Sequence, residues 1–203
     1  MTTGEHDTDN EIIGHIREGD ARTFSLLVDR HKERGMSLAF RMLRNREEAE
    51  EALQDAFVRA FKALPGFEMK AAFSTWFYRI VFNVCATRLS RKGDPLRGML
   101  EQEEEAFENR GSPDPLPDQV LESDQTAEII QEEIGKIPEV YGTTFTLFAL
   151  HERTYDEIVE ITGVPLGTVK ARLFRARTML RDAVARRLHM KREKSTPDKG
   201  RAA

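Results

Sequence analysis

The sequence predicts an all-α protein with two small helical domains joined by an acidic flexible linker, the second domain containing a helix-turn-helix. Apolar residues recur at helical spacing in both halves of the 203-residue chain, and no run alternates apolar with polar residues as a strand would. Between the halves, residues 93–125 combine prolines, glycines and acidic side chains, which cannot bury enough apolar surface to fold. We therefore expect domains at 1–92 and 126–190, and a basic disordered tail at 191–203.

Three helices and a short leading one are expected in the first domain. Asp9 precedes residues 11–18 and has the residue type of a helix cap. The next helix is expected at 20–43, followed by one at 47–64, where alanines, leucines and phenylalanines including Phe61 form a single apolar stripe. A proline-glycine pair ends that stripe, and the last helix is expected at 74–91.

Charge is distributed unevenly along the chain, although the net charge is only -4. Residues 93–125 hold 2 basic and 10 acidic side chains, a net charge of -8. Residues 168–194 hold 10 basic and 2 acidic side chains, a net charge of +8. A basic helix is an electrostatic footprint for phosphate, but a solvated charged helix would have the same composition.

The second domain is expected to have helices at 126–137, 139–150 and 154–161, and a long helix from Pro165 or Leu166 to about 189. The last two have the spacing of a helix-turn-helix. Thr154 and Glu157 are placed to form a capping box, and Gly163 can adopt positive φ in the turn. An ordinary helical hairpin shares this turn and core pattern, so the residues of the long helix are needed to distinguish it from a helix-turn-helix.

A helical wheel separates the long helix into two faces. One is an apolar core stripe of Val169, Leu173, Ala176, Leu180 and Val184. Opposite lie Thr168, Ala171, Arg175 and Thr178, flanked by Lys170 and Arg172. A slim, positively charged leading face is what a helix needs to enter a major groove. There Arg175 could reach guanine edges, and the other polar side chains could reach phosphates or bases.

The helix at 74–91 also carries a mixed polar face. Trp76, Arg79, Asn83 and Thr87 fall together, away from the predicted core stripe that includes Phe77. An aromatic ring, a cation, an amide and a hydroxyl can together stack on an unpaired base and bond its edge. The alternative is that Trp76 packs against a neighbouring helix and Arg79 is merely solvated.

Motifs in both halves resemble the extracytoplasmic-function (ECF) sigma factors of the sigma-70 family. Residues 155–158, followed by 167–177, are similar to region 4, except that Ala171 stands where serine is common and Val159 where alanine is. Residues 48–60 resemble region 2.2. Phe67, residues 73–80 and Asn83 resemble regions 2.3 and 2.4, although the loop at 68–72 departs from the usual basic, glycine-containing form.

The resemblance implies three groups of site residues. Region 2.2 docks on the β′ clamp helices of core RNA polymerase, which implies polymerase contacts by Glu51, Gln54, Asp55 and Arg59. Regions 2.3 and 2.4 melt the minus-10 element and capture an extruded base, which implies DNA contacts by Phe67, Trp76, Arg79 and Asn83. Region 4 reads the minus-35 element, which implies DNA contacts by Thr168, Lys170, Ala171, Arg172, Phe174 and Arg175.

The expected function is that of an alternative sigma factor, which binds core polymerase and directs promoter-specific initiation in a stress or envelope response. Expected partners are the β′ clamp helices and β flap of the polymerase, promoter DNA and an anti-sigma factor. We expect no enzyme activity, cofactor, metal site or stable membrane insertion, and a cytoplasmic location. The alternatives are a helix-turn-helix regulator that acts without polymerase and a helical adaptor with no nucleic-acid role.

Other features of the sequence exclude further classes of protein. A single cysteine, Cys85, rules out an intramolecular disulfide. No apolar run approaches the roughly 18 residues of a membrane helix, and the N-terminus has no signal-peptide pattern. His151 and Glu152 begin like a zinc-protease helix, but Tyr155 stands where the second histidine would have to be.

Overall fold

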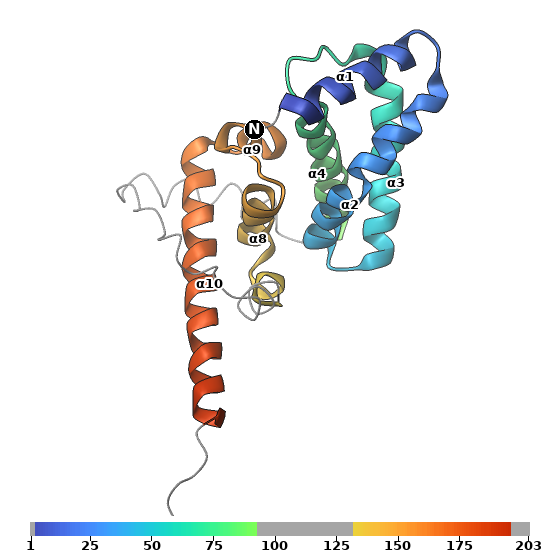
Figure 1. Cartoon of the computed structure of the whole chain (residues 1–203). Coiled ribbons are helices and arrows are strands. Elements are labelled where there is room, and N and C mark those ends of the chain that lie inside the picture. Colours follow the sequence, from blue (N-terminus) through green and yellow to red (C-terminus); the bar gives the residue numbers. More distant parts are fainter. Residues whose placement is uncertain (1–2, 93–131, 196–203) are drawn as a thin grey trace, which may run out of the picture.

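The computed structural model describes the backbone of residues 3–92 and 132–195, and side chains within 9–92 and 132–187. Every element in these ranges is a helix or helical turn, and none of the described residues forms a strand (Figure 1). The predicted fold class is thereby confirmed. The predicted linker at 93–125, and residues 126–131 of the helix expected there, lie outside the described residues. None of the described helices is long and apolar enough to cross a bilayer.

The first domain follows the predicted order of helices. It consists of α1 (Thr3–Arg17), η1 (Ala21–Thr23), α2 (Phe24–Leu43), α3 (Arg46–Ala63), η2 (Leu64–Gly66) and α4 (Phe73–Arg91). The turn from α2 to α3 is set by two adjacent residues. Arg44 adopts a left-handed conformation (φ 52°) that ends α2, and the side chain of Asn45 accepts from the backbone N–H of Glu48 to cap α3.

The predicted role of Asp9 as a helix cap is wrong. α1 begins six residues earlier than Asp9, which lies inside the helix and is 4 % exposed. One carboxylate oxygen of Asp9 lies 2.8 Å from Nε2 of His31, and the other accepts from Arg30 at 2.5 Å. Asp9 therefore ties α1 to α2, because a buried carboxylate requires polar partners.

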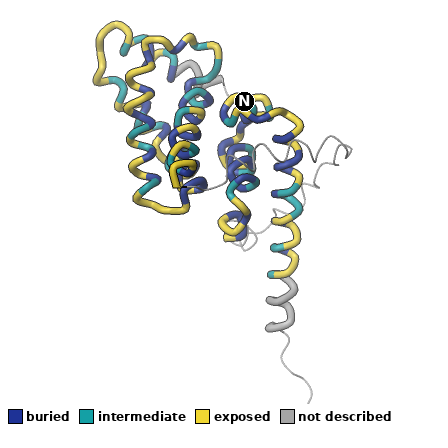
Figure 2. Tube along the Cα trace, turned by 180° about the vertical axis from the view of Figure 1, so that it is seen from behind, coloured by how far each residue is buried: buried dark blue, intermediate teal, exposed yellow. Residues whose placement is uncertain are grey.

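Aromatic rings fill the centre of the first domain. The ring of Phe77 stacks on that of Phe57 at 4.4 Å and lies parallel to that of Phe73 at 5.9 Å. Gly35 of α2 permits this packing, since a Cβ there would approach Leu53 to 2.7 Å and the Phe77 ring to 3.3 Å. Figure 2 shows the resulting pattern, with buried positions along the inner faces of the helices and exposed positions along their outer faces.

The second domain contains the predicted helix-turn-helix. Its elements are α8 (Glu139–Phe145), a continuing π-helical turn η4 (Thr146–Leu150), α9 (Tyr155–Thr162) and α10 (Leu166–Ser195). The capping box is present. Thr154 Oγ1 accepts from the Glu157 N–H at 3.2 Å, and Glu157 Oε2 accepts from the Thr154 N–H at 2.8 Å. Gly163 has φ 73°, as the turn requires.

α10 is longer than the sequence pattern suggested. It was expected to end near residue 189, with a disordered tail from 191, but the helix continues to Ser195. No glycine or proline interrupts residues 168–195, and the next proline is Pro197, so nothing in the local sequence stops the helix earlier. Residues 196–203 lie outside the described part of the chain.

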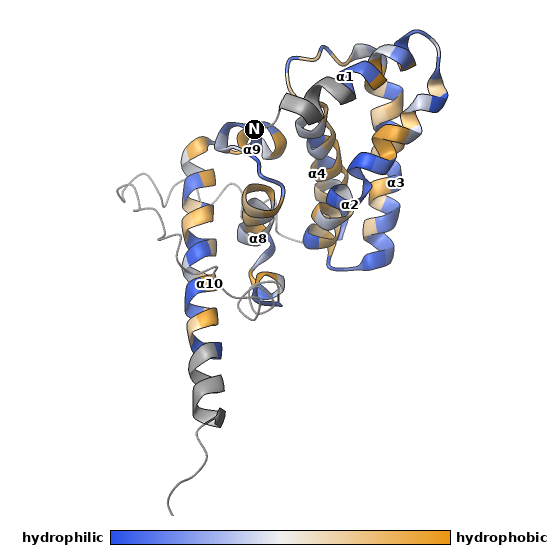
Figure 3. Ribbon diagram, in the orientation of Figure 1, coloured by the Kyte–Doolittle hydropathy of each residue, from blue (hydrophilic) through white to orange (hydrophobic). Residues whose placement is uncertain are grey.

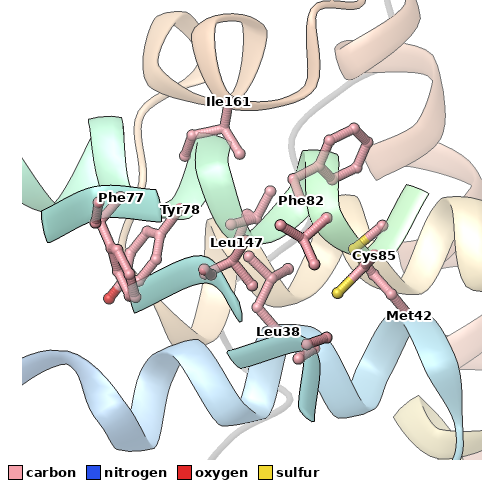
Figure 4. Packing of buried hydrophobic residues seen from close by; sticks show 14 of the residues in the cluster. Leu38, Met42, Phe77, Tyr78, Phe82, Cys85, Leu147 and Ile161 are labelled. Carbon is pink, nitrogen blue, oxygen red and sulfur yellow. The ribbon is translucent and has the colours of Figure 1, made fainter. Parts of the chain in front are cut away.

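The two domains share one apolar core, which the sequence pattern did not predict. α4 packs against α9, and α2 packs against α8, so that α8 and α9 lie between the first domain and α10 (Figure 1). Met42, Phe82 and Cys85 of the first domain meet Leu147 and Ile161 of the second in one buried cluster (Figure 4). The arrangement is therefore a closed one, in which both domains bury apolar surface against each other.

Candidate nucleic-acid interface

The outer face of α3 carries the four residues predicted to bind polymerase. Glu51, Gln54 and Arg59 are exposed and Asp55 is half-buried, while Ala52 and Ala56 behind them are fully buried. Glu51 accepts from Arg88 of α4 at 3.0 Å, and Asp55 pairs with Arg59 at 3.2 Å. These carboxylates are accessible and are held on one helical face.

Two apolar side chains of α3 are also exposed. Val58 is 51 % and Phe61 42 % exposed, although Phe61 belongs to the apolar stripe predicted for this helix. Phe61 instead packs at the edge of Phe24, with ring centroids 5.0 Å apart. An exposed face that mixes carboxylates with apolar groups is typical of a protein-binding surface, because nucleic acid would repel the carboxylates. Helical spacing alone could not have revealed this, since it does not distinguish an apolar interface from a core.

The mixed polar face of α4 is present, but its aromatic part is packed. Arg79 and Asn83 are exposed, and Trp76 is half-buried. The ring of Phe67, which is 5 % exposed, lies 4.8 Å from the ring of Trp76 and 6.1 Å from that of Phe73. The structure thus brings Phe67 and Trp76 together. Phe67 itself does not stand at the surface, because its ring fills the space beneath Trp76.

The loop that follows Phe67 is anchored by the N-terminal helix. The guanidinium of Arg17, the last residue of α1, donates to the backbone carbonyl of Phe67. Further along the loop, Met69 has φ 55°, and Lys70 pairs with Glu68 at 2.5 Å on the exposed side. The contact from Arg17 spans 50 residues, so no local sequence pattern could have indicated it.

α10 has the predicted core stripe, but its opposite face is less open than the wheel indicated. Val169, Leu173, Ala176, Leu180 and Val184 are all buried, which confirms that part of the prediction. Lys170 and Phe174 are exposed, whereas Thr168, Ala171 and Arg172 are between 2 % and 8 % exposed. The wheel placed Thr168 and Ala171 opposite the core stripe, with Arg172 beside them, but in this closed arrangement all three are buried. Figure 3 shows hydrophilic and hydrophobic segments following one another along α10.

Tyr141 of α8 accounts for the half-buried state of Arg175. Nη1 of Arg175 donates to the Tyr141 hydroxyl at 2.7 Å, and the guanidinium lies 5.6 Å from the centre of the Tyr141 ring. A guanidinium over an aromatic face is held by both charge and packing. The wheel could not include this contact because Tyr141 precedes Arg175 by 34 residues.

An aromatic and cationic cluster lies where η4, α9 and α10 meet. The rings of Phe148 and Tyr155 are 5.4 Å apart, and the guanidinium of Arg177 lies 5.0 Å from the centre of the Phe148 ring. Nearby in sequence, Leu150 and Phe174 are 42 % and 43 % exposed. The sequence reading did not single out this cluster, whose members belong to three different elements.

The described residues show neither a reactive thiol nor a metal-binding cluster. Burial raises the pKa of the Cys85 thiol to about 12, which keeps it protonated and unreactive at neutral pH. No group of three or more metal-ligating side chains occurs among the residues whose positions are described. The accessible candidate surfaces are the α3 face, the α4 polar face and the first turns of α10.

Comparison with known proteins identifies relatives of both domains. The family model for sigma-70 region 2 matches residues 27–94, and that for sigma-70 region 4 matches residues 127–180. The ECF RNA polymerase sigma factor SigW of Bacillus subtilis is 34 % identical over 175 residues, covering 83 % of this chain and 92 % of SigW. The ECF sigma-E factor of Escherichia coli K12 is 32 % identical over 181 residues, covering 87 % and 94 %.

Solved structures support the fold. CnrH in complex with the cytosolic domain of CnrY has a TM-score of 0.58 at 22 % identity, covering 87 % of this chain and 97 % of CnrH. The sigma factor RpoE in complex with the anti-sigma factor NepR from Bartonella quintana also has a TM-score of 0.58, at 18 % identity, covering 80 % and 96 %. At these identities the similarity is one of fold.

Proposed function

This chain belongs to the ECF group of the sigma-70 family, and from that premise we propose how its two domains divide the work of promoter recognition. It is an alternative sigma factor that binds core RNA polymerase and directs promoter-specific initiation. The observation that carries this function is the order of the two motifs, since regions 2 and 4 match in sequence along one chain. A helix-turn-helix regulator that acts without polymerase would leave the match over 27–94 unexplained.

The outer face of α3 is proposed to dock on the β′ clamp helices of core polymerase. Its exposed Glu51 and half-buried Asp55 offer carboxylates, and the neighbouring Val58 and Phe61 offer apolar area. Carboxylates steer and orient such a docking, while apolar side chains contribute most of the binding free energy. Gln54 and Arg59 extend the same face.

The polar face of α4 is proposed to read the melted minus-10 strand. Trp76 presents a partly exposed ring on which a base can stack, and Arg79 and Asn83 are exposed beside it for phosphate and base-edge contacts. Phe67 supports this pocket from beneath, because it is buried against Trp76. Arg17 in turn fixes the backbone of Phe67.

The first turns of α10 are proposed to enter the major groove at the minus-35 element. Lys170 and Phe174 project from the helix there, and the amino end of α10 attracts phosphate. Arg175 would leave Tyr141 to reach base edges, with Thr168, Ala171 and Arg172 closest to the DNA backbone. The cluster of Phe148, Leu150, Tyr155 and Arg177 is proposed to receive the β flap of the polymerase.

The remaining partners follow from the family. We propose that an anti-sigma factor holds the protein inactive, and that it works in the cytoplasm, where core polymerase transcribes. One structural relative, CnrH, was solved in complex with the cytosolic domain of CnrY, and another, RpoE, in complex with the anti-sigma factor NepR. The protein would supply binding surfaces to the polymerase and no catalytic step of its own.

Run-off transcription with core polymerase and a cognate promoter tests this function directly. Glu51→Arg and Asp55→Arg should each abolish the transcript and the capture of core polymerase, because like charges would then meet in the interface. Glu18→Arg reverses an exposed carboxylate that follows α1 directly, away from the α3 face, and serves as the control. Wild-type polymerase capture by both α3 variants would overturn the docking assignment. Absence of any transcript with the unaltered protein would overturn the function.

A further inference from the structure

The loop that enters α4, residues 67–72, depends on contacts from outside itself. Among the described residues, its backbone-to-backbone hydrogen bonds lie at its two ends, where the Phe67 N–H donates to the Leu64 carbonyl and the Ala72 carbonyl accepts from the first turn of α4. Between these ends, Met69 has φ 55°, a left-handed conformation that residues with a side chain rarely adopt. Neighbouring elements must therefore hold the loop in this conformation.

The carboxyl end of α1 supplies such a contact. The guanidinium of Arg17 donates to the carbonyl of Phe67, and Figure 1 shows α1 beside the loop that enters α4. One helical turn earlier, Ile12 and Ile13 are 5 % and 0 % exposed, which fixes α1 against the core of the first domain. The donor to the loop is thus carried by a packed helix and not by a mobile segment.

The other end of the described part of α1 is fixed to α2. The carboxylate of Asp9 lies 2.8 Å from Nε2 of His31 and accepts from Arg30, and both Asp9 and His31 are less than 5 % exposed. A buried carboxylate with charged donors has a well-defined geometry. Asp9 and Arg17 are separated by about 12 Å along the helix at 1.5 Å per residue. α1 therefore spans from α2 to the loop.

Both ends of α1 lead to the aromatic rings beneath the proposed base pocket. The ring of His31 lies 5.2 Å from that of Phe73, which lies 5.6 Å from the ring of Trp76. At the other end, Arg17 holds the backbone of Phe67, whose ring lies 4.8 Å from that of Trp76. Two separate sets of contacts thus fix the ring on which a base is proposed to stack.

The position of that ring matters for base preference more than for binding. Every base has a face that can stack on an aromatic ring, so stacking alone does not distinguish one base from another. Discrimination comes from hydrogen bonds to the base edge, which weaken steeply when the distance or angle changes. A displaced Trp76 ring would still hold a base, but it would no longer align the edge of that base with Asn83 on α4.

We propose that α1 is a brace that sets the base preference of the pocket on α4, with Arg17 as a positioning residue for the loop and Asp9 as the anchor of the helix. The inference rests on the proposed reading of the melted minus-10 strand by α4. It assigns a role to an element that precedes residues 27–94, the part of the chain that the region 2 model matches.

Three substitutions in the full-length protein test the brace. Arg17→Met removes the donor to Phe67 and keeps the apolar stem of the side chain, whereas Arg17→Lys retains a charged donor. Arg22→Met is the matched control, because it removes the same charge from an exposed arginine of η1. Arg17 is itself exposed, so α1 should remain folded in all three variants, which far-ultraviolet circular dichroism checks.

The first measurement needs neither polymerase nor DNA. Trp76 is the only tryptophan in the chain, so the fluorescence of the free protein reports on the ring of the proposed pocket. We expect acrylamide to quench Trp76 more strongly in Arg17→Met, because the Phe67 ring beside it is no longer fixed. Arg17→Lys and Arg22→Met should be quenched like the wild type.

The second measurement is strand opening by the holoenzyme, detected with permanganate, on a cognate promoter and on versions with single substitutions in the minus-10 element. The quantity compared is the ratio of opening on the cognate promoter to opening on each substituted one. Arg17→Met should lower the largest of these ratios by about tenfold, the effect of losing one hydrogen bond from a charged donor. A smaller folded fraction would instead lower opening on every promoter alike and leave the ratios unchanged.

The outcomes separate the brace from the function on which it rests. Wild-type quenching and wild-type ratios in Arg17→Met would overturn the brace while the sigma-factor function stands. A uniform loss of opening on all promoters in Arg17→Met would leave Arg17 a purely structural role and would also overturn the proposal, as would an Arg17→Lys variant that behaves like Arg17→Met. Failure of the wild-type holoenzyme to open any promoter would overturn the proposed function of α4 instead.

Discussion

A fall in pH should separate the two domains, because it protonates the buried ring of His151. The ring is 1 % exposed, and neither of its nitrogens has a hydrogen-bond partner among the described residues. It faces the Tyr78 ring from α4, the charge of Arg34 from α2 and that of Arg153 from its own loop. Burial, and then the charges of Arg34 and Arg153, lower the pKa of His151 from 6.5 to about 4.

The size of the effect follows from the difference in pKa between the closed and open states. In the open state the ring is solvated and keeps its ordinary pKa of about 6.5. The closed state binds its proton more weakly, so its stability is fully present above pH 6.5 and falls as the pH drops from 6.5 to 4. Between pH 7.5 and pH 5 the loss is about 2 kcal/mol, or about 30-fold in the ratio of closed to open protein.

The neighbouring carboxylate does not obscure this titration. Burial alone would raise the pKa of Glu157, but hydrogen bonds from Thr154 and Thr75 and the charge of Arg153 outweigh it, and the pKa lies below its usual 4.5. Glu157 therefore stays ionised between pH 7.5 and pH 5. His15, on α1, has a 65 % exposed side chain and offers a control histidine outside the interface.

The assay is the distance between spin labels attached to cysteines introduced at the exposed positions Glu50 and Arg181, one in each domain, measured at intervals from pH 7.5 to pH 5. The wild type and His15→Phe should shift from the short to the long distance on acidification. His151→Phe keeps the packing against Tyr78 without a titratable group, and should stay closed throughout. A wild type whose closed fraction is the same at pH 5 and pH 7.5 would refute the argument, as would an equal acid response in His151→Phe.

Three further substitutions test the DNA contacts and the helix cap. Arg175→Ala should weaken binding of the holoenzyme to a minus-35 duplex by about 1–3 kcal/mol and relax specificity at one position. Tyr141→Phe, which removes only the hydroxyl partner of Arg175, should do neither. Equal losses of affinity across all DNA sequences in Arg175→Ala would rule out a base contact. Asn83→Ala should spare duplex binding but reduce permanganate-detected strand opening, and wild-type opening would return Asn83 to a solvated role. Thr154→Ala should lower the free energy of unfolding of the second domain by about 1 kcal/mol, measured by urea denaturation; an unchanged midpoint would mean that Glu157 alone suffices as a cap.

The features that the sequence predicted well are local ones. Helix positions, the capping box of Thr154 and Glu157 and the positive φ of Gly163 each depend on residues within a few positions of one another. The core stripe of α10 depends only on the helical repeat. Such signals are complete within a single element, so no knowledge of the neighbouring elements is needed to interpret them.

What the sequence could not indicate depends on contacts between distant segments. Asp9 looked like a cap because its partner His31 lies 22 residues away, and the exposure of Phe61 was not predicted because an apolar stripe does not reveal how far neighbouring helices extend. The contact of Arg175 with Tyr141, which lies 34 residues earlier, likewise could not be predicted, and it partly buries Arg175 on the face expected to enter the groove. The closed arrangement itself rests on pairs such as Thr75 and Glu157, which are 82 residues apart.

The two oxygens of the Glu157 carboxylate have different hydrogen-bond partners. One oxygen completes the amino end of α9 through the Thr154 N–H, and the other accepts from Arg153 of the same domain and from Thr75 across the domain boundary. A change that removes this side chain therefore weakens the helix and the contact between domains together, while a change at Thr75 touches the contact alone. When the domains part, the second oxygen exchanges its Thr75 donor for water and keeps Arg153, while the first keeps its backbone donor. The first turn of α9 is thus a shared component, through which the folding of one domain is thermodynamically linked to its association with the other.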